Sequence, residues 1–231
     1  MEKIEQENYL NTKYSLDNLK KQKESILTNP TTFTGFDRIG SEKNVVIKTY
    51  YDTPDFFFHE RGLTININAV KGSKNCDLVV RWDTGRERIR FLSNIPDTFV
   101  KKISVKDSIY SESEYIAECI SQLVPNGLNV DISKLVNSLR GVVVVKKKRE
   151  SYKYISINGL KINLHFSNAE FTTPLNRNKS TIYMLEVTST DIDRQMDYDQ
   201  FARKILFNNP TLIKLQNSDV KIGRENLFDK N

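Results

Sequence analysis

The sequence predicts an α+β fold built on a mainly antiparallel sheet or barrel. Three observations predict it: short β-branched and aromatic runs bounded by turn residues, a change to helical spacing in the middle of the chain, and a return to strands before a last helix. This segregation favours an antiparallel sheet, because strands joined by parallel crossovers alternate regularly with helices.

The strands are predicted from residue type and alternation. The run 45–51 is β-branched and aromatic, and the run 63–70 follows it after a turn. A turn at 83–85 joins two further strands, and the loop 71–75 separates the second of these runs from the next. The predicted strands are 3–9, 45–51, 63–70, 77–82, 86–92, 142–155, 160–166 and 182–188.

Four helices are predicted from apolar spacing and from end signals. Ser111 and Glu114 form a capping box before apolar residues at i, i+3, i+4 and i+7, and Pro125 ends that helix. Ser15 is expected to cap an earlier helix, which Pro30 ends. The predicted helices are 15–27, 116–123, 132–139 and 197–207.

The composition is typical of a globular protein with a mildly basic surface. The 231 residues suffice for one well-filled core, and 12 Phe with 10 Tyr are too many for a disordered chain. Lys and Arg number 35 against 29 Asp and Glu, which leaves a net charge of +6. This excess suits an anionic partner such as a phosphate compound or a nucleic acid, and equally an ordinary lysine-rich surface.

The start of the chain and its apolar content predict a cytoplasmic protein. No signal peptide is expected, and no apolar run reaches the ~20 residues that span a bilayer. Cys76 and Cys119 are too few for a disulfide framework. Together with His59 and His165 they lack the spacing of a zinc site.

Charged side chains at alternate positions are the candidates for chemistry, because every second residue of a barrel strand points inward. Glu5 and Glu7 share one face of the first strand, although a solvent-exposed strand face would look the same. The arginines at 86, 88 and 90 repel one another, so either an anion or glutamates across the strand would stabilise them. Lys147 and Arg149 also share a face.

The stretch 50–68, with Tyr51-Asp-Thr-Pro54 and Gly62-Leu63, closely resembles the signature hairpin of the CYTH superfamily, the triphosphate tunnel enzymes. Arg149 and Glu186 match two further positions of that family, and Ser218 to Lys221 loosely resembles its closing segment. The resemblance implies a single tunnel domain over residues 1–231. It also implies a closed antiparallel β-barrel of about eight strands with peripheral helices.

The resemblance implies ligands as well. Family members hold a linear triphosphate with basic side chains, and their acidic side chains hold Mg²⁺ or Mn²⁺. By resemblance, the catalytic and metal-binding residues are Glu5, Glu7 and Glu186. The implied substrate-binding residues are Arg81, Arg86, Arg88, Arg90, Lys147 and Arg149. The partner would be a triphosphate-containing small molecule or an RNA 5′ end, with no membrane, and the oligomeric state is left open.

The chain departs from the family pattern at several of these positions. Asn66 and Asn68 replace an Arg-x-Arg pair, His165 replaces an acid, and Thr188 replaces a glutamate. A hydrogen bond to a charged group contributes about 1.5–3 kcal/mol, so the two asparagines would weaken phosphate binding roughly a hundredfold or more. We hypothesise that the arginines at 86 to 90 compensate. His165 is either a phosphate donor, an acid–base group or a structural histidine.

These departures leave the activity open. The first hypothesis is a divergent metal-dependent triphosphatase that hydrolyses tripolyphosphate or a nucleoside or other organic triphosphate. The alternative is a catalytically degenerate CYTH module that binds a phosphate compound or nucleotide without cleaving it. An adenylate cyclase and a capping-type RNA 5′-triphosphatase rank lower, because no base-recognition residues are identified and the hairpin is more similar to small stand-alone CYTH proteins.

Overall fold

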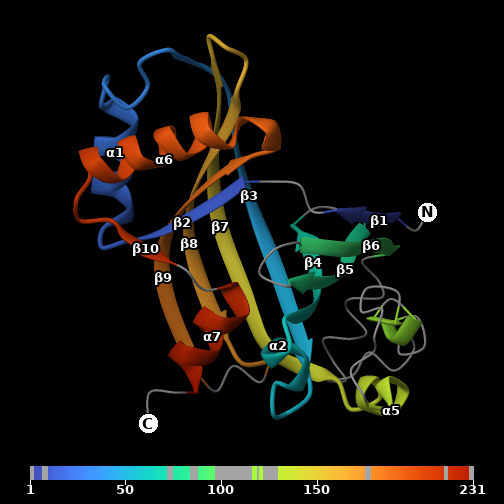
Figure 1. The fold of residues 1–231 in the computed structure, drawn as a ribbon. Coiled ribbons are helices and arrows are strands. Elements are labelled where there is room, and N and C mark those ends of the chain that lie inside the picture. Colours follow the sequence, from blue (N-terminus) through green and yellow to red (C-terminus); the bar gives the residue numbers. More distant parts are fainter. Residues whose placement is uncertain are drawn as a thin grey trace.

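A computed structural model describes residues 3–6, 10–71, 75–83, 88–96, 116–118, 120–121, 130–174, 178–215 and 218–228. For residues 3–6, 75, 83 and 88–96 it describes the backbone alone. The fold is α+β, as the sequence predicts. The described residues form one antiparallel sheet of ten strands, with helices packed against it (Figure 1).

The strands follow one another mostly as antiparallel neighbours. They are β1 (Lys3–Gln6), β2 (Leu10–Leu16), β3 (Phe36–Asp52), β4 (Leu63–Val70), β5 (Asn75–Asp83), β6 (Arg88–Pro96), β7 (Arg140–Ser156), β8 (Lys161–Thr172), β9 (Lys179–Ser189) and β10 (Ile213–Leu215). Their order in the sheet is β1-β6-β5-β4-β3-β7-β8-β9-β2-β10. The two central strands, β3 and β7, are each 17 residues long and pair along most of that length.

The described helices are α1 (Leu19–Thr28), α2 (Phe57–Glu60), α5 (Ile132–Val136), η2 (Ile192–Arg194), α6 (Gln195–Asn208) and α7 (Asp219–Leu227). Of these, α1, α6 and α7 have 9 to 14 residues and the others have 3 to 5. Residues 116–118 and 120–121 are also helical. Within the described ranges, no helix combines the length and the apolar character needed to cross a membrane.

The sequence-based boundaries are accurate at β4, but β3 begins at Phe36 rather than at 45, β8 ends at Thr172 rather than at 166, and β2 and β10 were not predicted as strands. The helix predicted from Ser15 begins at Leu19, with Asn18 as its N-cap, because 10–16 is strand β2. The alternation that makes this strand is visible in the sequence, since Tyr14 and Leu16 are buried and Ser15 between them is not. Helix α7 was not predicted.

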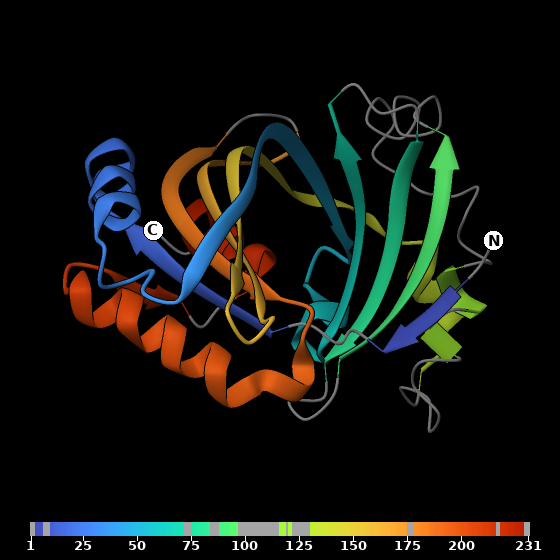
Figure 2. The same cartoon turned by 90° about the horizontal axis from the view of Figure 1, so that it is seen from above.

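The sheet is strongly curved, which gives it an inner, concave face and an outer, convex face (Figure 2). In the hydrogen-bonded order the edges are β1 and β10, and no pairing between described residues joins them. Closure into an eight-stranded barrel therefore stays a prediction. The inner face is the one that bears Lys147, and the outer face is the one that bears Tyr14.

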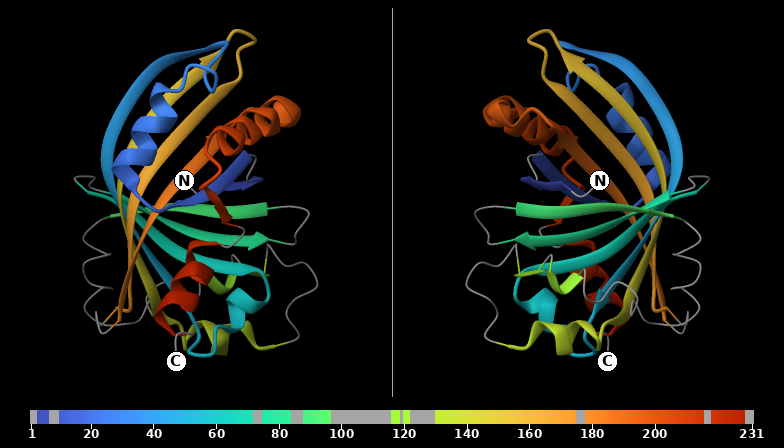
Figure 3. Two further views of the ribbon diagram at one scale, coloured as in Figure 1. Left: turned by 90° about the vertical axis from the view of Figure 1, so that its left-hand side faces the viewer. Right: turned by 90° about the vertical axis from the view of Figure 1, so that its right-hand side faces the viewer.

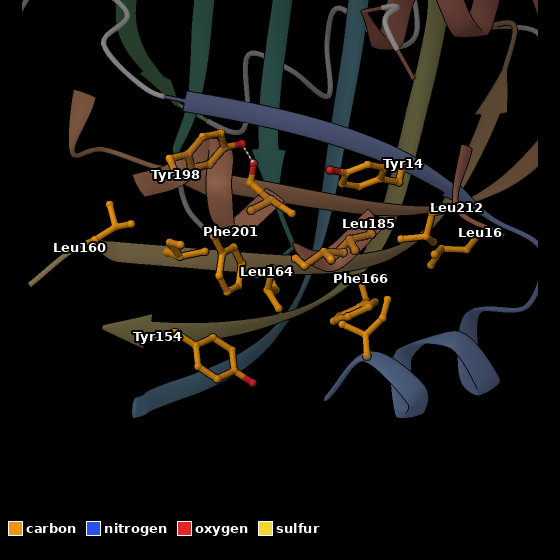
Figure 4. Close-up of a cluster of buried hydrophobic side chains, with 14 residues drawn as sticks. Tyr14, Leu16, Tyr154, Leu160, Leu164, Phe166, Leu185, Tyr198, Phe201 and Leu212 are labelled. Carbon is orange, nitrogen blue, oxygen red and sulfur yellow. Dashed lines mark hydrogen bonds between the residues drawn. The ribbon is translucent and has the colours of Figure 1, made fainter. Parts of the chain in front are cut away.

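The outer face of β2, β8 and β9 packs against α1 and α6 (Figure 4). Tyr198 and Phe201 of α6 lie against Leu164 and Leu185 in this cluster. The Tyr198 hydroxyl donates a hydrogen bond of 2.8 Å to the backbone carbonyl of Val187. Each large apolar side chain buried here contributes about 1.5–3 kcal/mol, so this cluster stabilises the packing of α1 and α6 on the strands.

The outer face of β4 and β5 has a separate apolar cover. Ile65, Ile67 and Val80 pack against Ile116 and Val136, which come from the helical segments that follow β6 in the chain. Side chains of a strand alternate between the two faces. The same strands therefore turn their polar residues toward the inner face.

Helix α7 lies on the inner face, packed against β7, β8 and β9. Val220 and Ile222 contact the cluster that contains Val143 and Phe171. Gly223 permits this close approach, because a Cβ at that position would lie 2.5 Å from Cγ1 of Val143. Figure 3 shows α7, in red, at the end of the sheet opposite α1 and α6.

The Tyr51-Asp-Thr-Pro54 turn is held together by Asp52, which is buried. Asp52 Oδ1 accepts hydrogen bonds from the backbone N–H groups of Thr53 (2.7 Å) and Phe58 (3.0 Å), and Oδ2 accepts from His59 (2.8 Å). The carboxylate therefore fixes α2 to the end of β3. Gly62 leads into β4 with a φ of 77°, a conformation that glycine adopts without strain.

Candidate functional site

Four cationic side chains gather on the inner face, and we call them the basic cluster: Lys13 of β2, Lys48 of β3, and Lys147 and Arg149 of β7. Two carboxylates lie among them, Glu186 of β9 and Asp219 of α7. Cross-strand pairing explains part of the assembly, because Lys13 stands directly opposite Glu186.

The alternation of β7 places Lys147 and Arg149 in the cluster. Val143 and Val145 occupy the same face of the strand and pack against α7, so the next residue on that face, Lys147, is carried into the interior. Its exposed fraction is 0%. A charge at such depth requires paired carboxylates, and the structure supplies two.

Lys147 bridges the two carboxylates. Its Nζ lies 2.6 Å from Glu186 Oε1 and 2.8 Å from Asp219 Oδ2. Arg149 Nη2 donates to the other oxygen of Glu186 at 3.0 Å. Both oxygens of Glu186 therefore already accept from a cation.

Asp219 draws three lysines together. Lys13 Nζ lies 2.8 Å from Asp219 Oδ1, and Lys48 Nζ lies 3.8 Å from Oδ2. The Tyr50 hydroxyl donates to Oδ2 over a longer distance of 3.4 Å. Asp219 is the first residue of α7, where a negative charge is favoured by the helix dipole, and Ser218 caps the helix.

The charges perturb one another. Burial alone would raise the pKa of Glu186 and of Asp219, but Lys147 and Lys13 outweigh it and lower both. Burial lowers the pKa of Lys48 to about 8; Asp219 opposes this shift and Lys147 adds to it. Among the described side chains, the basic cluster thus has two more positive charges than its two carboxylates neutralise.

A neutral polar group lies beside the basic cluster, toward the turn between β7 and β8. His165 Nδ1 is 2.8 Å from Ser151 Oγ, and His165 Nε2 is 3.2 Å from Thr188 Oγ1. Burial, followed by repulsion from Arg149, lowers the pKa of His165 to about 4. The imidazole is therefore neutral near pH 7.

The two asparagines of β4 also face inward. Asn66 is 2% exposed, and its Nδ2 donates to Asn68 Oδ1 at 2.7 Å. Asn68 stands opposite Lys48 in the β3–β4 pair. The asparagines therefore extend the inner face next to the basic cluster without adding charge.

The predicted site residues are distributed unevenly. Lys147, Arg149 and Glu186 are brought into direct contact. Arg81 lies on β5, opposite Arg90. Burial alone would lower the pKa of Lys13. Asp219 and Glu186 nevertheless raise this pKa overall, and the positive charge of Arg81 acts against the rise.

The remaining predicted residues either are described by their backbone alone or lie outside the described residues. Glu5 of β1 stands opposite Arg90 of β6, and Arg88 belongs to the same strand; their side chains lie outside the description. Glu7 and Arg86 fall outside the described residues. The catalytic, metal-binding and substrate-binding roles of all these residues stay predictions.

Three residues of the site were not identified from the sequence: Lys13 and Lys48 of the basic cluster, and Asp219. Lys13 was placed outside any strand, although the apolar positions 10, 14 and 16 alternate around it. Lys48 lies within a predicted strand, but the sequence alone does not show whether its side chain faces the interior or the solvent. No local sequence pattern predicts Asp219 as a site residue, because its position depends on where α7 packs.

The described carboxylates do not fit a divalent metal ion. Mg²⁺ and Mn²⁺ prefer oxygen ligands, but each oxygen of Glu186 and Asp219 has a lysine or arginine nitrogen within 3.0 Å. Within the part of the chain that the structure describes, no group of three His, Cys, Asp or Glu could hold a metal. Of the three predicted metal ligands, this leaves Glu5 and Glu7, whose side chains lie outside the description.

Comparison with known proteins supports the fold. No protein-family model matches the chain, and no curated protein matches it. A candidate adenylate cyclase from Bacillus halodurans is similar with a TM-score of 0.55 and 12% identity, over 94% of this chain and 97% of that one. A candidate adenylyl cyclase from Hippeastrum with a dominant triphosphatase activity has a TM-score of 0.52 and 13% identity, over 97% of this chain and 96% of that one. At these identities the likeness shows a shared fold, and it confirms the resemblance to CYTH, or triphosphate tunnel, proteins at that level.

Proposed function

We propose that the protein binds a triphosphate-containing small molecule on the inner face of the sheet, with the basic cluster as its phosphate contacts. The observation that carries this proposal is the uneven charge of the cluster. The four cations of the basic cluster contact two carboxylates, Glu186 and Asp219, and the side chains of Lys13, Lys48 and Arg149 are each 17–24% exposed. A purely structural network would be balanced, because an uncompensated buried charge is costly.

Lys48 is the member of the cluster that most needs an anion. It lies 3.8 Å from Asp219, whereas Lys13 and Lys147 lie 2.8 Å from the same carboxylate. The lowered pKa of Lys48 reflects its burial. A bound phosphate would stabilise its charged form and would also accept from Arg149, whose guanidinium donates bidentately to phosphate oxygens.

Binding is tested by isothermal titration calorimetry with inorganic tripolyphosphate in EDTA. We expect Lys13→Met to weaken binding about tenfold or more, since it removes one charge-assisted hydrogen bond. Lys214→Met is the matched control, because Lys214 is exposed on the neighbouring strand β10 and should leave the affinity unchanged. Equal affinities for Lys13→Met and the native chain would contradict the proposal.

Hydrolysis of the bound triphosphate is the second candidate function, favoured by the fold shared with the Hippeastrum protein. It would require Glu5 and Glu7 to hold Mg²⁺ or Mn²⁺, in a sheet closed as a barrel through the first strand. Such a metal neutralises developing charge and positions water. In this function the basic cluster would hold the phosphates of the substrate.

Phosphate release in the presence of Mg²⁺ or Mn²⁺ separates the two candidates. In a hydrolase, Glu5→Gln and Glu7→Gln would abolish release while tripolyphosphate binding in EDTA persists. A native chain that binds tripolyphosphate but releases no phosphate with either metal would be a binding protein only. RNA with a 5′-triphosphate, supplied as an alternative substrate, tests the capping-type reaction in the same assay.

A further inference from the structure

The outer face of the sheet holds a pocket beside α1, on the opposite side of the strands from Lys147. Its volume is about 460 Å³, within the ~300–1,000 Å³ of typical small-molecule sites. Helix α1 forms one wall, and strands β3, β7 and β8 form the base. Arg149 borders the pocket as part of β7, although its guanidinium contacts Glu186 on the inner face.

The pocket uses part of a basic run that the inner face leaves outside. Residues 146–149 are four consecutive cations, and strand alternation directs Lys147 and Arg149 to the inner face. Lys146 and Lys148 therefore face outward, and both are exposed. Of these two, Lys148 lines the pocket.

The base of the pocket is apolar. Val45 stands opposite Lys148 in the β3–β7 pair, and Phe166 stands opposite Glu150 in the β7–β8 pair. Phe166 is buried in the cluster that α1 covers, and Leu19, the first residue of α1, packs against the same cluster (Figure 4). Val45 and Leu19 are only partly buried, so a ligand that covers them removes apolar surface from water.

The edge of the pocket is positively charged. Glu150 accepts a hydrogen bond of 2.7 Å from Lys23 of α1, and Lys43 Nζ of β3 lies 3.0 Å from its other oxygen. Lys23 and then Lys43 lower the pKa of Glu150 to about 2, so this carboxylate is ionised. With Lys148, three lysines line the pocket against this one carboxylate.

Two donors at the pocket are free to bind an anion. Lys148 and Asn168 stand opposite each other in the β7–β8 pair. Neither side chain forms a hydrogen bond or an ion pair with another residue that the structure describes. Directly opposed side chains have Cβ atoms ~4.5–5.5 Å apart. The ammonium of Lys148 and the amide N–H of Asn168 can therefore donate to the two oxygens of one carboxylate.

We propose that this pocket binds an organic carboxylate with an aliphatic chain. Its head group accepts hydrogen bonds from Lys148 and Asn168, and its chain lies over Val45 and Leu19. The positive charge of the pocket selects the anionic head group, and the apolar base selects the chain. The site is separate from the proposed triphosphate site, because inorganic tripolyphosphate has no apolar part to cover this base.

The experiment titrates the full chain with butyrate, hexanoate, octanoate and decanoate by isothermal titration calorimetry. The affinity should rise about fourfold for each methylene group that the pocket buries. Saturating tripolyphosphate should leave the decanoate affinity unchanged, since the basic cluster lies on the other face of the sheet. An affinity that is independent of chain length would contradict the proposal.

Three variants locate the binding. Lys148→Met should weaken decanoate binding about tenfold, since it removes a charge-assisted hydrogen bond. Lys146→Met is the matched control, because Lys146 is exposed on the same strand and lies outside the pocket. Val45→Asp should abolish binding, because its carboxylate would pair with Lys148 and place a charge on the apolar base. Thermal unfolding confirms that each variant is folded.

The outcomes are distinguishable from those of the triphosphate site. Absence of decanoate binding, or equal weakening by the Lys146 and Lys148 variants, would overturn the proposal. Displacement of decanoate by tripolyphosphate would also overturn it, because the pocket would then recognise charge alone. None of these results decides the proposed function, which Lys13→Met tests separately.

Discussion

The two halves of the sheet differ in how they use the inner face. In the half that contains β7, β8, β9 and β2, apolar residues and α7 seal one end, and the basic cluster lies beside them with Glu186 and Asp219. In the half that contains β4 and β5, the outer face is equally apolar, but the described inner face carries Asn66 and Asn68 in a mutual hydrogen bond, with Asp77 and Arg81 of β5 on the same face. The cations that contact Glu186 and Asp219 therefore lie in the first half and on β3.

This difference separates the architecture of the fold from its chemistry. The signature hairpin belongs to the asparagine half, and its Asp52 holds α2 by accepting hydrogen bonds from backbone N–H groups of the turn and the helix. The cations lie mainly on strands outside that hairpin. A chain can thus keep the hairpin for its packing while the charges that face a ligand are rebuilt elsewhere.

The largest effect on stability is expected from removing Lys147, the cation that bridges Glu186 and Asp219. Lys147→Met should lower the free energy of unfolding by about 3–5 kcal/mol, because it leaves two buried carboxylates without their shared cation. Urea denaturation measures the change. Lys146→Met, one residue earlier and exposed, is the control and should change stability little. A loss below about 1 kcal/mol for Lys147→Met would contradict the central role of this lysine.

Asp219→Asn should change stability and ligand binding in opposite directions. The free energy of unfolding should fall by about 1–3 kcal/mol, since Lys13 and Lys147 lose a charged acceptor. Tripolyphosphate affinity should rise about tenfold, because Asp219 no longer competes with phosphate for those lysines. Asp197→Asn, in the exposed first turn of α6, controls for the helix dipole. An affinity that falls would mean that α7 assists binding.

Returning charge to the asparagine half should have a smaller effect. Asn68→Arg places a guanidinium opposite Lys48, and we expect tripolyphosphate binding to strengthen about fivefold. Asn66→Arg is a less suitable test, because Asn66 is buried. Calorimetry gives the affinity, and unchanged or weaker binding would show that the rebuilt half already supplies the phosphate contacts.

The smallest effect is expected in proton uptake. Burial first, with Lys147 adding to it, lowers the pKa of Lys48 to about 8, and a bound phosphate would raise it again. Tripolyphosphate binding near pH 8 should therefore take up a fraction of a proton, measured by calorimetry in buffers of different ionisation enthalpy. Lys48→Met should abolish this uptake. Uptake that persists in the variant would assign it to another group.

The same shift of Lys48 predicts how stability depends on pH. Since the pKa in the folded chain lies below its usual value of 10.5, the unfolded chain binds more protons between about pH 8 and 10.5. The contribution of Lys48 to the free energy of unfolding should therefore rise with pH across this window. Below pH 8 the lysine is protonated in both states, and its contribution is constant. Comparison with Lys48→Met isolates this contribution from other titrating groups.

Much of the fold could be predicted because local patterns determine it. The limits of β4, the extent of α6 and the α+β class follow from alternation, helical spacing and capping residues, which act over a few positions. The strand at Lys13 was missed because Ser15 also suits a helix cap, and the choice between them depends on pairing with β9.

The site was predicted in part for the same reason. Arg149, Lys147 and Glu186 could be identified from strand alternation and family resemblance, but not their contacts, which join residues 37–39 positions apart. Asp219 lies 206 positions from its partner Lys13, so no local pattern could connect them.

The sequence by itself determined the class of fold, the hairpin that resembles the CYTH signature, and the loss of two arginines from that hairpin. The tertiary structure alone decided which charges meet. It placed α7 on the inner face and put Asp219 among three lysines. The physical reason is that side-chain propensities act locally, whereas ion pairs and buried hydrogen bonds depend on the packing of strands that are distant in the chain.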